Sequence, residues 1–245
     1  MREFLNRNLE LWALIRRTDQ PNTKLVVFVH GFRGDYLTTW GKLPSLLMGN
    51  ADLNPPFDTW DFLFLGYPTR RMGTYLDITD LIGTAWRAAY KGEDQFTHKY
   101  QRLALFGHSL GTLGVRQLLC AWRPDLYGPL TVVHSVTLFG TPLSGSPWAP
   151  LAGLTGYTIA GALKESNPQL RMLRCWWDHS PVRRNWPRAR LMLGTDDRVV
   201  GYQRRELVNW AGDAAPNLTN FDHSALVKPA SWAASTIVPY IARGL

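Results

Sequence analysis

The chain has 245 residues, 45% of them hydrophobic and 19% charged, so it can bury a sizeable core, and disorder of the whole chain is excluded. The net charge of +8 comes with arginines in scattered pairs and with no nucleic-acid-binding motif. We therefore expect no nucleic-acid partner but a solvated basic surface, with peripheral contact to an anionic membrane or an acidic substrate as the alternative.

The first residues, MREFLNRNLELWALIRR, interleave charged and apolar side chains and contain no continuous apolar core of a signal peptide. No window reaches the about 18 uncharged apolar residues that a membrane-spanning helix needs. We therefore predict a cytoplasmic protein that does not cross a membrane. Its two cysteines, Cys120 and Cys175, are too few for a disulfide framework, and we expect free thiols, with one bridge between them as the alternative.

Short apolar runs that end in glycine or proline alternate with stretches of helical spacing along the chain. This alternation is typical of an α/β domain with a mostly parallel sheet, and continuous apolar runs indicate strands covered by helices on both faces. We predict one domain over residues 1–245. The expected strands are 25–31, 61–68, 102–109, 134–142 and 189–197, and the expected helices are 74–91 and 110–122.

Residues 147–187 carry no strand signal, and the surrounding stretch is compatible with a helix over about 159–175. We predict a short cap inserted into the domain. Its tryptophans, Trp148 and Trp176 among them, offer apolar area for a substrate, with packing in the core as the alternative.

The stretch from Gly107 to Gly111 matches G-x-S-x-G, with an apolar strand leading in and a helix leading out. This context predicts a sharp turn that presents the Ser109 hydroxyl at the end of the strand, in a strained backbone conformation. The flanking glycines are expected because the neighbouring helix and strand approach too closely for a Cβ atom. A plain glycine-serine turn is the alternative. A phosphate-binding loop is not expected, because its lysine and its glycine spacing are missing.

A serine hydroxyl is a weak nucleophile that needs a base and an orienting carboxylate, which follow in the order Ser, Asp or Glu, His in this type of fold. The last predicted strand leads into GTDDRVV, and a polar loop near the C-terminus contains His223. We predict His223 as the base, with a capping or surface role as its alternative. We predict Asp197 as the acid, because burial of Val199 and Val200 would fix the direction of its side chain. Asp196 is the alternative.

The developing oxyanion needs backbone donors, one after the nucleophile and one from the loop after an early strand. The first is the N–H of Leu110. The HGFRGD turn predicts the N–H of Phe32 as the second, with a simple glycine turn as the alternative. No group of His, Cys or Asp has metal-ligand spacing, so we predict no metal.

Taken together, HGFRGDYLTTW, FGHSLG, FGTPLSGSPWA, GTDDRVV and DHSALVKP resemble the α/β-hydrolases, and most closely the serine esterase and lipase-like branch that includes relatives of the GPI inositol deacylases. The resemblance implies cofactor-free cleavage of a small-molecule or lipid ester by Ser109, Asp197 and His223. An acyltransferase, a thioesterase or a peptidase would use the same residues. A non-catalytic binding module of the same fold is a further alternative.

Overall fold

The computed structural model describes residues 2–5, 11–15, 22–49, 57–94, 96–149, 156–179, 189–200, 217–231 and 237–245. Within these ranges no helix is both long enough and apolar enough to cross a membrane. Cys120 and Cys175 are both free, as predicted.

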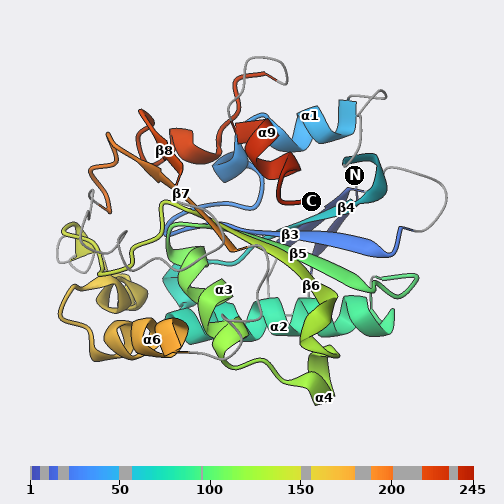
Figure 1. Cartoon of the computed structure of the whole chain (residues 1–245), viewed down its shortest axis with the longest axis horizontal. Helices are drawn as coiled ribbons and strands as arrows, with labels where there is room; N and C mark the ends of the chain where they lie inside the picture. Colours follow the sequence, from blue (N-terminus) through green and yellow to red (C-terminus); the bar gives the residue numbers. More distant parts are fainter. Residues whose placement is uncertain are drawn as a thin grey trace.

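An eight-stranded sheet in the order β1-β2-β4-β3-β5-β6-β7-β8 forms the centre of the structure (Figure 1). The strands from β4 to β8 in this order are parallel, whereas β2 pairs antiparallel with both β1 and β4. The strands are β1 (Arg2–Leu5), β2 (Leu11–Ile15), β3 (Lys24–Val29), β4 (Asp61–Leu65), β5 (Arg102–His108), β6 (Val133–Phe139), β7 (Ala189–Gly194) and β8 (Asn217–Thr219).

Helices cover both faces of this sheet, as the apolar strands predict. In Figure 1, α2, α3, α4 and α6 lie below the sheet, and α1 and α9 lie above it. The α-helices are α1 (Leu43–Gly49), α2 (Tyr75–Lys91), α3 (Leu110–Cys120), α4 (Pro124–Tyr127), α6 (Pro168–His179) and α9 (Ile237–Ala242). The 3₁₀ helices are η1 (Thr38–Trp40), η2 (Phe57–Thr59), η3 (Thr69–Arg71), η4 (Leu130–Val132), η5 (Thr158–Leu163) and η6 (Ala225–Val227).

Each face of the sheet has its own apolar core, because successive side chains of a strand point to opposite sides. In β3, Leu25 and Val27 pack into the core between the sheet and helices α2 and α3. Val26 and Phe28 pack into the opposite core, against α1 and α9. The central parallel strands are therefore buried on both faces.

All five predicted strands are present, and so are the two predicted helices, α2 and α3. Helix α2 starts at a capping box, in which the Thr74 side chain accepts from Leu76 N–H and Asp77 accepts from Thr74 N–H, and it ends at Gly92 with a φ of 71°. Three further strands, β1, β2 and β8, were not predicted from the sequence. β1 and β2 form a hairpin at one edge of the sheet, and β8 has only 3 residues.

The predicted cap is only partly within the described residues, since 150–155 and 180–188 lie outside them. The stretch 159–175, which is compatible with a helix by its sequence, is helical in two parts, η5 and α6, with a break between them. The Asn167 side chain accepts hydrogen bonds from the N–H groups of Gln169 and Leu170, and Pro168 starts α6. An Asx turn followed by proline favours a helix start at this point, which is why the chain breaks here.

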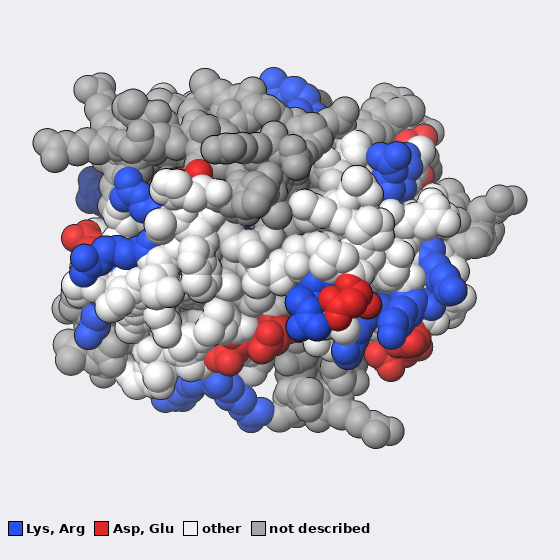
Figure 2. Space-filling view, turned by 60° about the horizontal axis from the view of Figure 1, so that its bottom comes forward, with Lys and Arg blue, Asp and Glu red and all other residues white. Residues whose placement is uncertain are grey.

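Surface charge on the face beneath the sheet is mixed. Figure 2 shows Lys and Arg side chains interspersed with Asp and Glu side chains across this face. Arg123, for example, donates to both carboxylate oxygens of Asp125. The visible charges therefore form no continuous basic patch on the described part of this face.

Candidate active site

Ser109 occupies the turn between β5 and α3, in the strained conformation that the sequence predicts. Its φ of 52° and ψ of −124° are rare for a residue with a side chain. Hydrogen bonds hold this backbone from both sides: Ser109 N–H donates to the Phe139 carbonyl over 2.9 Å, and the Thr112 hydroxyl lies 2.6 Å from the Ser109 carbonyl oxygen. The turn therefore presents the Ser109 side chain at the carboxyl end of β5.

The two glycines that flank the serine are required by close packing, as predicted. A Cβ atom on Gly111 would lie 2.4 Å from the His30 carbonyl oxygen, and one on Gly107 would lie 3.0 Å from the Thr112 Cα atom. Both contacts involve backbone, which cannot move aside cheaply. Helix α3 can therefore approach β3 closely only with glycine at these positions.

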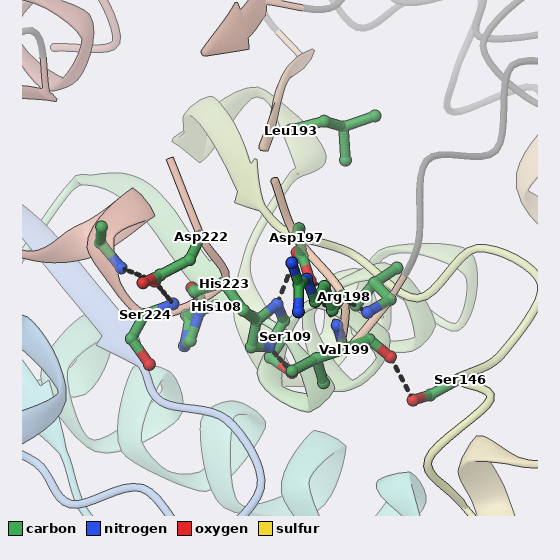
Figure 3. A network of polar contacts seen from close by, with 12 residues as sticks. His108, Ser109, Ser146, Leu193, Asp197, Arg198, Val199, Asp222, His223 and Ser224 are labelled. Carbon is green, nitrogen blue, oxygen red and sulfur yellow. Dashed lines mark hydrogen bonds and ion pairs between the residues drawn. The ribbon is translucent and has the colours of Figure 1, made fainter. Parts of the chain in front are cut away.

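Ser109, His223 and Asp197 form one hydrogen-bonded row (Figure 3). Ser109 Oγ lies 2.8 Å from His223 Nε2, and His223 Nδ1 lies 2.6 Å from Asp197 Oδ2. Because a carboxylate only accepts, Nδ1 carries the ring proton and Nε2 accepts the serine proton. Asp197 follows β7 and His223 follows β8, so the parallel strands bring both residues to the same edge as Ser109.

Asp197, and not the adjacent Asp196, reaches the histidine. Its other carboxylate oxygen accepts from the N–H groups of Val199 and Val200, at 2.9 and 3.0 Å. Asp197 is 4% exposed, whereas Asp196 is exposed to solvent. Burial alone would raise the pKa of Asp197, but the hydrogen bond to His223, the His223 charge and the two N–H groups together lower it, so the carboxylate is ionised at neutral pH.

His108, next to the serine, supports the His223 backbone. Its Nε2 lies 2.9 Å from the His223 carbonyl oxygen and therefore donates to it. Burial, together with the nearby His223, lowers the pKa of His108 to about 3, so this ring is neutral. No local sequence pattern predicts this contact, because the two histidines are more than a hundred positions apart along the chain.

The loop after β3 lies directly against the serine. A Cβ atom on Gly31 would lie 2.7 Å from Ser109 Cβ, so this loop reaches the nucleophile only with glycine there. His30 holds the loop: its Nδ1 donates to the Gly31 carbonyl over 2.9 Å, and its Nε2 accepts from Tyr67 N–H over 3.2 Å. Burial lowers the pKa of His30 to about 4, which keeps it neutral.

The two predicted oxyanion donors belong to the two segments next to Ser109, the start of α3 and the loop after β3. Leu110 is the first residue of α3, and the N–H groups in the first turn of a helix have no acceptor within that helix. Phe32 follows Gly31 and lines the space around Ser109 and His223. Its ring packs edge-on against Tyr157 of the predicted cap, with ring centroids 4.9 Å apart.

Two cavities of about 240 Å³ each meet at Ser109 and His223. One is mostly apolar and contains Trp148 in its wall, while the other is polar and contains Arg33 and Lys228. Trp148 is 51% exposed, and its Nε1 donates to the Arg198 carbonyl over 2.7 Å. Trp176, the other predicted substrate contact, is exposed on α6 and lines neither cavity.

A second contact that the sequence did not predict joins the start of the cap region to the acid loop. The Ser146 hydroxyl donates to the Val199 carbonyl, two residues after Asp197 (Figure 3). Ser146 N–H also donates to the Leu163 carbonyl over 2.8 Å. The wall of the apolar cavity is thereby attached to the loop that carries the carboxylate.

Esterases and lipases are among the solved structures that align with this chain. Lipase BlEst2 from Bacillus licheniformis aligns with a TM-score of 0.62 at 16% identity, over 88% of this chain and 92% of the lipase. The chain has the α/β-hydrolase fold. An S-formylglutathione hydrolase from Agrobacterium tumefaciens aligns with a TM-score of 0.54 at 13% identity, over 92% and 88% of the two chains.

Phospholipase PlaB from Legionella pneumophila has a TM-score of 0.55 at 22% identity, and the match covers 71% of this chain but only 38% of the phospholipase. No protein-family model matches the chain, and no curated protein matches it in sequence. Among the described residues, no group of three His, Cys, Asp or Glu side chains is arranged to hold a metal ion.

The two buried neutral histidines predict a loss of stability in mild acid. In the unfolded chain His30 and His108 take up protons below about pH 6.5, whereas in the folded chain their pKa values are about 4 and about 3. Stability is therefore fully present above pH 6.5, and each histidine lowers the free energy of unfolding by up to about 1.4 kcal/mol per pH unit as the pH falls towards these values. Urea unfolding over a pH series measures this slope. His108→Gln should make it shallower, and an unchanged slope would show that His108 is not the buried neutral group described here.

Proposed function

We propose that this chain hydrolyses carboxylic esters through an acyl intermediate on Ser109. The hydrogen-bonded row of Ser109, His223 and Asp197 is the observation that carries the proposal. A serine whose hydroxyl donates to a histidine, which in turn donates to an ionised buried carboxylate, is the arrangement that activates a hydroxyl as a nucleophile. The esterases and lipases among the structural neighbours support the same reaction class.

In the first half of the reaction, Ser109 Oγ bonds to the ester carbonyl carbon as its proton moves to His223 Nε2. The carbonyl electron pair moves onto oxygen, and the N–H groups of Phe32 and Leu110 stabilise the resulting negative charge. When this intermediate collapses, the bond to the alcohol oxygen breaks, and His223 returns the proton to that oxygen. The alcohol leaves, and the acyl group stays on Ser109.

In the second half, water gives a proton to His223 Nε2 and its oxygen bonds to the acyl carbon. Collapse breaks the bond to Ser109 Oγ, which takes the proton back, and the carboxylic acid leaves. Asp197 stabilises the His223 cation in both halves and holds the ring in the tautomer that accepts at Nε2. An alcohol in place of water would make the same residues an acyltransferase, and a thioester substrate would make them a thioesterase.

The apolar cavity is suited to the acyl chain, because its walls include Leu163, Val200 and Trp148 beside Ser109. At about 240 Å³ it is smaller than most ligand cavities, which favours a short acyl chain. We propose a small-molecule or lipid ester as the substrate, without a cofactor. The motif likeness to relatives of the GPI inositol deacylases stays a prediction and is consistent with a lipid-derived ester.

Ser109→Ala should abolish ester turnover while the protein stays folded, because loss of the nucleophile typically lowers kcat by about 10⁶. Release of nitrophenol from short nitrophenyl esters measures kcat, and a fluorophosphonate probe should label the wild type but not this variant. His223→Ala should lower kcat to a similar extent, and His108→Ala should have a smaller effect. Ser45→Ala removes an exposed hydroxyl on α1 and serves as the control. Turnover by Ser109→Ala within tenfold of the wild type would refute the proposed mechanism.

Asp197→Asn and Asp196→Asn form a matched pair on one loop. An asparagine at the orienting position favours the wrong histidine tautomer, so Asp197→Asn should lower kcat by about 10⁴. The Asp196 carboxylate is exposed, and its replacement should change kcat less than tenfold. A larger loss at Asp196 would reverse the assignment of the acid.

Trp148→Ala should shift the preference towards longer acyl chains, because it removes a large side chain from the wall of the apolar cavity. The measurement is kcat/KM for nitrophenyl esters of increasing chain length. Trp176→Ala is the matched control, since Trp176 is 48% exposed and lies outside both cavities. A drop in melting temperature with an unchanged chain-length profile would mean that Trp148 has only a packing role.

A further inference from the structure

The chemistry described above uses Ser109, His223 and Phe32 from the wall of the polar cavity, but it gives no role to the two charged side chains there. Arg33 and Lys228 line this cavity, together with the hydroxyl-bearing residues Thr38, Thr39 and Ser224. Among the residues that the structure describes, no acidic side chain lines it. A cavity of about 240 Å³ with two cations and three hydroxyl groups beside the reacting serine is suited to a small anion.

The nearest acidic side chains along the chain are already engaged with backbone N–H groups. Asp35 accepts from the N–H groups of Leu37 and Thr38, at 2.9 and 3.0 Å. Asp222 accepts from those of Ser224 and Ala225, both at 2.8 Å. Neither carboxylate forms an ion pair with Arg33 or Lys228, and no other described residue does.

Arg33 is held at the cavity from two directions. Its backbone N–H donates to the Thr69 hydroxyl over 3.2 Å, and its guanidinium lies 5.9 Å from the centre of the Tyr157 ring. Arg70 lies 5.8 Å from the same ring, so two guanidinium groups converge on Tyr157. Two positive charges near one ring make the electrostatic potential there more positive, which favours a bound anion.

Lys228 belongs to a different segment of the cavity wall, directly after η6. Its stem packs on Gly41, where a Cβ atom would lie 3.1 Å from the Lys228 Cβ and Cγ atoms. Gly41 has a φ of 56°, which also favours glycine. Glycine at position 41 therefore leaves room for the stem of Lys228, which lines the same cavity as His223.

We infer that the alcohol part of the ester carries an anionic oxygen group, phosphate or carboxylate, which binds in the polar cavity between Arg33 and Lys228. The inference rests on the proposed function. The apolar cavity takes the acyl chain, so the alcohol part extends from the reacting carbonyl to the other side of Ser109. Guanidinium and ammonium groups there pair with phosphate or carboxylate oxygens.

Three short-chain esters that differ only in the alcohol test this inference: butyryl glycerol, butyryl glycerol 3-phosphate and butyryl glycerate. All three dissolve as monomers, so a charge effect arises at the protein and not at a membrane surface. We expect a kcat/KM about tenfold or more higher for an anionic ester than for the neutral one, from charge-assisted hydrogen bonds in a partly enclosed site. The better of the two anionic esters identifies phosphate or carboxylate as the natural group.

Arg33→Asn and Lys228→Gln remove the two cations, and asparagine tolerates the positive φ of 54° at residue 33. The readout is the ratio of kcat/KM between the anionic and the neutral ester, which corrects for any general loss of activity. Each variant should lower this ratio about threefold and the double variant should bring it close to one, as ion pairs of moderate strength do. Added salt should lower the wild-type ratio in the same direction.

Arg87→Gln is the control, because it removes one exposed positive charge on α2, outside both cavities, and should leave the ratio as in the wild type. Equal kcat/KM for neutral and anionic esters in the wild type, or a ratio unchanged in the double variant, would overturn the inference while ester hydrolysis stands. If the protein hydrolysed neither these three esters nor the nitrophenyl esters, the proposed function would be refuted and the inference with it.

Discussion

The strained backbone at Ser109 is the constraint on which the rest of the site depends. A residue with a side chain at a φ of 52° and a ψ of −124° costs on the order of 1–3 kcal/mol and persists only where its surroundings hold it. Here the Phe139 carbonyl accepts from its N–H, Thr112 binds its carbonyl, and the glycines at 107 and 111 let α3 pack tightly. The hydroxyl is therefore held at the sheet edge before any substrate arrives.

Buried neutral histidines complete this frame. His30 fixes the loop that carries Phe32, and His108 holds the backbone of His223. Because burial keeps both rings uncharged, they support His223 and Asp197 without placing a further charge beside them. Ser109 and His223 line both an apolar cavity and a polar cavity that contains Arg33 and Lys228, and in the proposed function each cavity would bind one side of the ester.

The sequence by itself determined the parts of the fold that follow from local patterns. Continuous apolar runs predict buried parallel strands, and the five that were predicted are β3, β4, β5, β6 and β7. The G-x-S-x-G turn, with its strand and helix, predicts the strained serine and the two close-packed glycines. The order of Ser109, Asp197 and His223 along the chain predicts their meeting, because parallel strands end at one edge of the sheet.

Only the tertiary structure decided features that join distant or weakly patterned segments. The strands β1 and β2 and the short edge strand β8 are stabilised by pairing with neighbouring strands, so their own sequences contain little pattern that predicts a strand. Asp196 and Asp197 are the same residue type at adjacent positions, and only the conformation of the turn after β7 brings one of them, Asp197, to His223. Arg33 and Lys228 lie almost two hundred residues apart, and they share a cavity because the loops after β3 and β8 converge on Ser109. Charge complementarity of this kind depends on distances in space, which no spacing along the chain encodes.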